Sequence, residues 1–322
     1  MYSSVMHAEV LSSFSLETEA LSTPSVEQAY RLMVDGEVPR GMQALFSSLA
    51  HSRAVLNESD WKRFCQDCRR HPIRELVHQD PITARSFAKP RGYAGDAVLM
   101  DLMYGMSPRS LGSASKLGQE VAQHVFGQPS ARSVRERRDL LARKIDRVAQ
   151  ETPGARILSV ACGHLREAPF SAAVREHRLG QFLALDQDPR SLAVVEQELA
   201  PSGIQAVPGS VKTLLKGETR FADLDFIYAA GLYDYLPQLV AIRLTHVLFS
   251  MLRSGGRLLV ANYIDSAHDA GYMEAFMDWW LLYREQRDVE EWLQDIPRGE
   301  LAGYQLQWDS PHNVLYLEAV RR

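Results

Sequence analysis

Short apolar runs alternate with helical stretches in the second half of this 322-residue chain, after a break at Thr152-Pro153-Gly154. Such alternation predicts a parallel sheet with helices on both faces. The expected strands cover residues 156–161, 181–185, 204–207, 224–229 and 257–263. Two further runs, 304–308 and 314–320, predict an antiparallel hairpin that closes the sheet. We therefore expect an α/β fold with a mostly parallel sheet and an antiparallel C-terminal hairpin.

The first half of the chain has mostly helical apolar spacing and few β-branched runs. We expect an N-terminal helical cap or substrate lid over residues 1–132 and a ligand-binding α/β domain over 133–322. Residues 133–148 form a basic amphipathic stretch whose arginines we assign to a solvated face. The aromatic stretch 271–293 predicts a helix, with its rings either packed in the core or forming a wall of the active-site cleft.

Composition excludes several classes of protein. Lys and Arg total 36 against 40 Asp and Glu, and no block of like charge stands out, so nucleic-acid binding is disfavoured. No apolar run approaches the ~18 residues that a membrane-spanning helix needs. Three cysteines cannot make a disulfide framework, and the first residues do not resemble a signal peptide, so we expect a cytoplasmic location.

Three turns at the carboxyl ends of expected strands have the chemistry of a ligand site, since ligands of doubly wound folds bind there. Residues 159–167 contain one glycine, which is not the spaced-glycine fingerprint of NAD or FAD sites. Asp186 is expected to bind ribose hydroxyls, and Asp188 to cap the next helix with Pro189 at its first position. In the third turn, residues 228–237, small residues end the strand, and Tyr233, Asp234 and Tyr235 are expected to enter the cleft mouth.

Over residues 133–322 these elements resemble the Rossmann-like fold of class I S-adenosylmethionine-dependent methyltransferases. The family has an acidic residue and Gly-x-Gly-x-Gly after strand one; here Ser159 replaces the acid, Ala161 and Leu165 replace two glycines, and Gly163 remains. The resemblance implies S-adenosylmethionine as methyl donor or as the substrate itself, with Ser210 as the candidate adenine contact. The implied cofactor-binding residues are Ala161, Cys162, Gly163, Arg166, Asp186, Gln187, Ser210, Val211, Ala229 and Gly231.

Residues 89–96 (KPRGYAGD) suit a tight exposed loop, either a structural turn with Arg91 and Asp96 paired or a functional element. With residues 229–237, this loop resembles two narrower groups. One is the 3-hydroxy fatty acid methyl ester synthase-like group, and the other is the bacterial azetidine-2-carboxylate synthases of specialised metabolism, which cyclise S-adenosylmethionine.

Chemistry at a sulfonium needs alignment of a lone pair and a site for the cation. Tyr93, Tyr233 and Tyr235 are the candidate aromatic faces. Arg91, and after it Arg166, are the candidates for the cofactor carboxylate. The implied catalytic residues are Tyr93, Arg91, Asp96, Tyr233 and Asp234, of which Asp96 or Asp234 would orient an amine.

Three functions stay open: methyl transfer to a small carboxylic acid or hydroxyl, cyclisation of S-adenosylmethionine with release of methylthioadenosine, and a catalytically silent binding protein. We expect a small-molecule substrate, no nucleic-acid or membrane partner, and allow for a homodimer. Cys65-x-x-Cys68 with His71 has metal-like spacing but lacks a second ligand pair, so no metal is expected. Cys162 is expected to be a small buried residue rather than a nucleophile.

Overall fold

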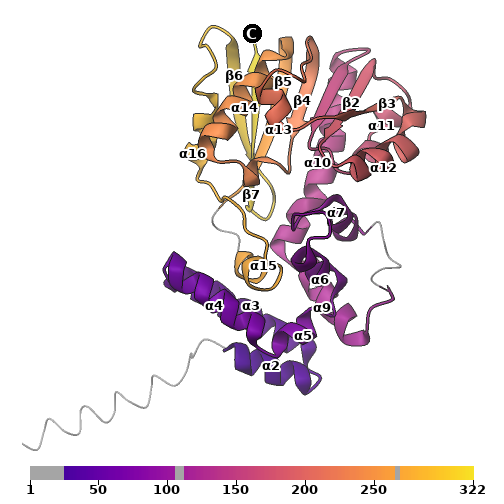
Figure 1. Cartoon of the computed structure of the whole chain (residues 1–322). Helices are drawn as coiled ribbons and strands as arrows, with labels where there is room; N and C mark the ends of the chain where they lie inside the picture. The colour runs from indigo at the N-terminus through magenta and orange to yellow at the C-terminus, as the bar shows by residue number, and fades with distance from the viewer. Residues whose placement is uncertain (1–24, 106–111, 265–268) are drawn as a thin grey trace, which may run out of the picture.

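The computed structural model describes residues 25–105, 112–264 and 269–322 (Figure 1). Most N-terminal helices begin at a residue whose side chain accepts a backbone N–H, as Ser25, Asn57, Asp80 and Asp96 do. The helices described before the first strand are α2 (Val26–Val34), α3 (Val38–Val55), α4 (Glu58–Arg70), α5 (Ile73–Val77), α6 (Pro81–Ala88), α7 (Ala97–Met103), α9 (Lys116–Gly127) and α10 (Pro129–Glu151).

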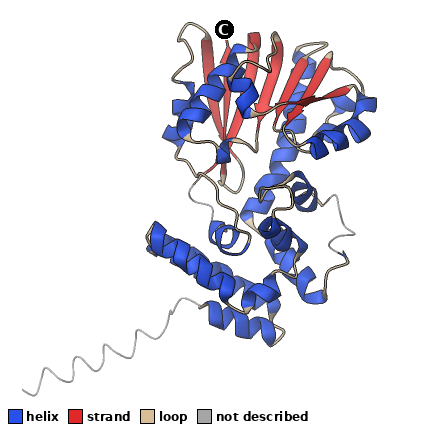
Figure 2. Cartoon of the chain, viewed as in Figure 1, coloured by secondary structure: helices blue, strands red, loops and turns tan. Residues whose placement is uncertain are grey.

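A seven-stranded sheet follows, in the order β3-β2-β1-β4-β5-β7-β6. Its strands are β1 (Arg156–Val160), β2 (Gln181–Asp186), β3 (Ile204–Pro208), β4 (Leu224–Ala229), β5 (Leu252–Tyr263), β6 (Leu301–Trp308) and β7 (Val314–Arg321). The first five pair in parallel, and β7 runs antiparallel to both β5 and β6. This mostly parallel, Rossmann-like sheet with an antiparallel C-terminal hairpin and an N-terminal helical part confirms the predicted α/β fold class (Figure 2).

Helices cover both faces of the sheet, so alternate strand residues enter different cores. Ile157 packs in one core with residues of α10 and α12, whereas Leu158 packs in the other with residues of α13 and α14. The elements between and after the strands are η1 (Ala168–Phe170), α11 (Ala172–Arg175), α12 (Pro189–Leu199), η2 (Ala200–Ser202), α13 (Val211–Leu215), η3 (Tyr233–Tyr235), α14 (Gln238–Ser250), α15 (Ala270–Phe276), α16 (Gln286–Glu290) and η4 (Glu291–Leu293).

The helical part and the sheet are joined by shared elements. Helix α10 is continuous across residues 132 and 133, where we expected a domain boundary, and leads from the helical part to the sheet (Figure 1). Helix α15, which follows β5 in the chain, packs on α3 and α4 among the N-terminal helices. One apolar core runs from these helices onto one face of the sheet. The N-terminal helices are therefore anchored at the carboxyl edge of the strands.

The predicted helix over 271–293 is wrong in its middle. Helix α15 ends at Phe276, and Asp278 adopts a left-handed backbone conformation with φ of 47°. The Asp278 side chain accepts bonds from Arg69, Lys89 and the Trp280 indole. Distant partners thus stop the helix, and an extended segment follows until α16. Among the described residues, no helix is long and apolar enough to cross a membrane.

Candidate active site

A cavity of about 1230 Å³ lies at the carboxyl ends of β1, β2 and β4, where the helical part meets the sheet. Its walls come from the turns after these three strands, from the loop between α6 and α7, and from α7 and α10. Strand order reverses between β1 and β4, which is where open α/β sheets bind ligands. The loop and the strand turns, expected separately from the sequence, therefore line one space.

The turn after β1 keeps the backbone shape of a glycine-rich loop with other side chains. Ala161, Gly163 and Leu165 have φ of 54°, 56° and 51°, all in the left-handed region. These are the positions where the resemblance puts three glycines. A Cβ on Gly163 would lie 3.3 Å from the Ala97 Cβ, so this turn also allows close contact with α7. The turn thus fits a ligand that approaches the backbone closely.

Asp186 ends β2 and holds this turn in place. Its carboxylate accepts the Gly163 N–H at 2.8 Å and the Asp188 N–H at 2.8 Å, and lines the cavity. Each carboxylate oxygen has a further lone pair for a ribose hydroxyl. Asp188 caps α12 through the Arg190 N–H, with Pro189 at the first helical position, as predicted. Gln187 lines the cavity beside them.

Ser210 and Val211, at the start of α13, also line the cavity. Ser210 forms a capping box with Thr213, so its hydroxyl accepts the Thr213 N–H at 3.2 Å. Gly209 precedes them, and a Cβ there would lie 2.9 Å from a Leu185 methyl. Ser210 and Val211 therefore stand at the cavity wall, where the resemblance puts the adenine contact.

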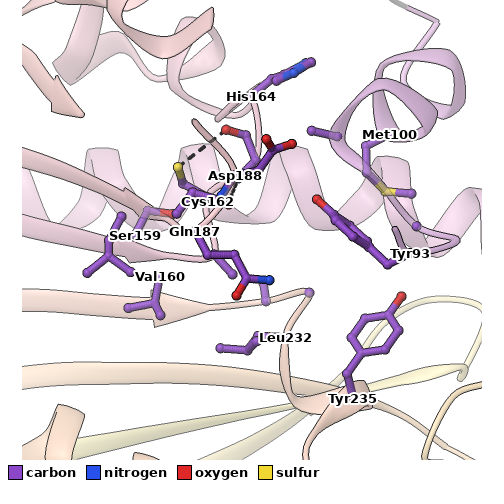
Figure 3. A pocket seen from close by; sticks show the side chains of 18 of the residues that line it. Tyr93, Met100, Ser159, Val160, Cys162, His164, Gln187, Asp188, Leu232 and Tyr235 are labelled. Carbon is purple, nitrogen blue, oxygen red and sulfur yellow. Dashed lines mark hydrogen bonds between the residues drawn. The ribbon is translucent and has the colours of Figure 1, made fainter. Parts of the chain in front are cut away.

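Two tyrosines face the cavity opposite Ser159, Val160 and Cys162 (Figure 3). Tyr93 comes from the loop between α6 and α7. Tyr235 comes from η3, and its hydroxyl accepts the Trp279 indole N–H at 2.8 Å. Burial, followed by the charges of Asp186 and Asp188, raises the pKa of Tyr93 to about 12, so its hydroxyl stays protonated.

Gly95 lets the loop between α6 and α7 pack closely on Trp279 and Tyr235. A Cβ at Gly95 would lie 2.7 Å from the Trp279 ring and 2.9 Å from the Tyr235 hydroxyl. Trp279 belongs to the extended segment after α15 and lines the cavity, whereas Tyr272, Phe276 and Trp292 are buried in the cores. The aromatic stretch therefore contributes both core rings and one cleft wall.

Charged groups on one side of the cavity are tied to one another. Arg91 donates to Asp188 at 3.2 Å, to Ser191 at 3.0 Å and contacts His164 at 3.3 Å. Asp101 accepts from both His164 and Arg166. Burial alone would raise the pKa of Asp101, but these hydrogen bonds outweigh it and lower the pKa. We call these five groups, Arg91, Asp101, His164, Arg166 and Asp188, the paired side.

Three other charged groups that line the cavity, Arg137, Glu167 and Asp234, have no ion pair within the described residues. Asp234 is 4% exposed, and its Oδ1 accepts the Tyr263 N–H at 2.6 Å. Burial, opposed by that bond and by the charges of Arg137 and Arg284, raises its pKa to about 6. Burial also raises the pKa of Glu167, which accepts the Tyr228 hydroxyl at 2.7 Å. With Arg137, these two carboxyls make up what we call the open side.

Three assignments from the sequence are wrong in this geometry. Tyr233 is fully buried, packs on Trp292 and bonds Thr245 at 3.0 Å, away from the cavity. Asp96, predicted to orient an amine, does not line the cavity; it caps α7 and forms its ion pair with Arg85. The Arg91–Asp96 pair, one of the two alternatives for this loop, does not form. Ala229 is fully buried at the end of β4. Ala230 and Gly231, one and two residues later, line the cavity instead.

The other predicted cofactor-binding residues all line the cavity: Ala161, Cys162, Gly163, Arg166, Asp186, Gln187, Ser210, Val211 and Gly231. The Arg166 guanidinium donates its hydrogen bonds to the carboxylates of Asp101 and Glu198. Burial raises the pKa of the Cys162 thiol well above its usual range, which fits a neutral residue rather than a nucleophile. Cys65 and Cys68 are buried thiols on α4, and no cluster of metal-ligating side chains occurs among the described residues.

No known protein family and no curated protein matches this chain in sequence. Among solved structures, a possible exported protein from Bordetella parapertussis is similar, with a TM-score of 0.57 and 17% identity over 70% of this chain and 79% of that chain. At this identity, the similarity shows a shared fold alone.

Two methyltransferases are also similar, with lower TM-scores. The S-adenosylmethionine-dependent methyltransferase SibL matches with a TM-score of 0.47 and 16% identity over 75% of this chain and 70% of that chain. Magnesium protoporphyrin IX methyltransferase from Synechocystis PCC 6803, with bound S-adenosylhomocysteine, matches with 0.45 and 13% over 70% of this chain and 99% of that chain.

Proposed function

We propose that this protein binds S-adenosylmethionine in the cavity and transfers its methyl group to a small carboxylic acid or hydroxyl acceptor. The observation that carries the proposal is the single cavity shared by the β1, β2 and β4 turns and the loop between α6 and α7. The left-handed turn at Gly163 and the carboxylate of Asp186 supply the two features that a nucleoside site needs at this edge.

The residues of the cavity divide the work of binding. Asp186 would accept the ribose hydroxyls, while Ser210 and Val211 would contact the adenine. When bound, the cofactor supplies an activated methyl group on a sulfonium. Tyr93 and Tyr235 would place their ring faces and hydroxyls near that positive charge, where each face can stabilise a cation by ~0.5–2 kcal/mol.

The size of the cavity favours methyl transfer over a reaction of the cofactor alone. Sites for a single small molecule usually enclose ~300–1,000 Å³, and this cavity encloses about 1230 Å³. An acceptor can therefore enter beside the cofactor, in the part lined by α7, α10 and the extended segment after α15. A carboxylate acceptor needs no base, whereas Asp234 is placed to take the proton of a hydroxyl acceptor.

Cyclisation to azetidine-2-carboxylate is the second candidate. The cofactor's α-amine would attack its own γ-carbon and break the bond from that carbon to sulfur, so that methylthioadenosine leaves. This route needs a neutral amine, and Asp234, whose pKa burial raises to about 6, would be a base that accepts the proton of the α-ammonium group. A catalytically silent binding protein is the third candidate. The cytoplasmic location and a homodimer stay predictions.

One incubation separates these candidates. Purified protein is mixed with S-adenosylmethionine, alone and with octanoate or 3-hydroxyoctanoate, and products are identified by mass. Methyl transfer predicts S-adenosylhomocysteine and a methylated acid only when an acid is present. Methylthioadenosine from S-adenosylmethionine alone would select cyclisation. Calorimetric binding of S-adenosylhomocysteine without any product would select the silent protein, and absence of binding would refute the site.

A further inference from the structure

Arg137 of α10 is a cation on the cavity wall that the sequence assigned to a solvated face. Its Nη1 donates to the Ala230 carbonyl at 2.9 Å. Its Nη2 lies 3.5 Å from the Tyr104 hydroxyl and 3.7 Å from the Met100 sulfur. Arginine keeps its charge in proteins, so a full positive charge faces the open side of the cavity.

The partners of Arg137 distinguish it from the other two half-buried arginines of the cavity. Arg91 forms an ion pair with Asp188, and Arg166 forms ion pairs with Asp101 and Glu198. Arg137 forms none within the part of the chain that the structure describes, and its bonds go to neutral groups. The charge of Arg137 acts to lower the pKa of the nearby Asp234 and Glu167, but neither carboxyl forms an ion pair with it. A half-buried cation without a directly bonded carboxylate is costly, so its site favours an anion that arrives with a ligand.

The surroundings of Arg137 fit the body of an organic acid. Met100 and Tyr104 contact Arg137, and Val134 and Leu141 lie one helical turn to either side of it on α10. All four line the cavity. Gly231 keeps the space beside the guanidinium open, because a Cβ there would lie 3.3 Å from the Arg137 Nη1. The guanidinium retains N–H groups that can bind a carboxylate.

Resting on the function proposed above, we propose that Arg137 binds the carboxylate of the acceptor and that the acceptor is therefore a monocarboxylate with an apolar body. The carboxylate replaces the missing ion partner of the guanidinium. The apolar body packs on the side chains from α7, α10 and the segment after α15.

Calorimetry in saturating S-adenosylhomocysteine tests this assignment. The probes are octanoate and 3-hydroxyoctanoate, each compared with its uncharged primary amide. Wild-type protein is expected to bind each acid at least ~10-fold more tightly than its amide, because hydrogen bonds to charged groups are worth ~1.5–3 kcal/mol. Arg137→Gln is expected to lose this preference, and Arg137→Lys to keep part of it. Arg143→Gln, an exposed position on the same helix, is the matched control and is expected to keep all of it.

A second titration separates the acceptor from the cofactor as the source of the carboxylate. Arg137→Gln is expected to bind S-adenosylhomocysteine and methylthioadenosine, which lacks the carboxylate, as wild type does. Selective weakening of S-adenosylhomocysteine would overturn the acceptor assignment in favour of the cofactor's carboxylate. Equal binding of acids and amides by wild type, or no binding of either, would also overturn it. Failure of wild type to bind S-adenosylhomocysteine would instead refute the proposed function.

Discussion

The two sides of the cavity are built from the same kinds of charged residues but use them differently. On the paired side, Arg91, Arg166 and His164 are joined to Asp101 and Asp188, and these bonds fix the loop and α7 against the sheet. On the open side, Arg137, Asp234 and Glu167 bond only neutral groups. Paired charges hold the architecture, and charges without an ion partner are the ones left for a ligand.

The largest expected effect is on the proposed nucleoside site at Asp186. Asp186→Ala should weaken S-adenosylhomocysteine binding ~100-fold, because it removes the ribose acceptor and two backbone hydrogen bonds that shape the Gly163 turn. Calorimetry measures the change. Glu196→Gln, an exposed carboxylate change on α12, is the control and should bind as wild type does. An unchanged affinity in Asp186→Ala would remove the ribose assignment.

The next prediction contrasts one carboxyl from each side through the pH dependence of stability. Burial raises the pKa of Asp234 to about 6, above its unfolded value of ~3.9. The unfolded chain then holds fewer protons, so Asp234 lowers the free energy of unfolding as pH rises from about 4 to 6, by about 3 kcal/mol. Asp234→Asn should remove this loss.

Asp101 on the paired side should behave in the opposite sense. Its pKa is lowered because bonds from Arg166 and His164 outweigh burial, so its contribution to stability is present above pH ~4 and lost as pH falls further. Urea unfolding of wild type, Asp234→Asn and Asp101→Asn at about pH 2.5, 4.5 and 7.5 measures both, because the Asp101 contribution is lost only below pH ~4. If the two variants shifted stability with pH in the same sense, the division of the cavity into two sides would be refuted.

A smaller effect is expected at the aromatic ring of the loop. Tyr93→Ala should slow turnover ~10-fold while changing S-adenosylhomocysteine binding little, because that product carries no positive charge on sulfur. Tyr93→Phe keeps the ring face and should stay within a few-fold of wild type. Steady-state kinetics measures the turnover rate, and calorimetry measures the affinity for S-adenosylhomocysteine. A wild-type rate in Tyr93→Ala would exclude the loop from the chemistry.

The smallest effects concern the backbone of the β1 turn. Ala161→Gly should leave stability unchanged or raise it by up to ~1 kcal/mol, since it relieves an alanine with φ of 54°. Gly163→Ala should cost about 1–2 kcal/mol, because its φ is 56° and its new Cβ would press on Ala97. Thermal unfolding measures both. Equal effects of the same sign would mean that the turn is not held in the left-handed form.

The sheet could be predicted from the sequence because short apolar runs and their intervening helices are local signals. Asp186, Asp188 and Gly163 could be placed for the same reason, since Asp186 ends β2, Asp188 follows two residues later, and Gly163 lies in the turn after β1. Tyr233 could not be separated from Tyr235, because two residues apart on η3 one ring enters the core and the other enters the cavity. Local pattern does not decide between them.

Arg137 was missed because an arginine in a basic amphipathic helix usually faces solvent. Its position on the cavity wall depends on Ala230, Tyr104 and Met100, which come from β4's turn and α7. The break at Asp278 likewise depends on Arg69 and Lys89, about two hundred positions earlier. Helical periodicity carries no information about such distant partners.

A crystal structure of the protein with S-adenosylhomocysteine tests the central claim most directly. We predict the ribose hydroxyls on the Asp186 carboxylate, the adenine beside Ser210 and Val211, and the sulfur facing Tyr93. The guanidinium of Arg137 should remain free of the cofactor's carboxylate. A nucleoside bound elsewhere on the molecule, or a cavity that stays empty at saturating ligand, would contradict the account.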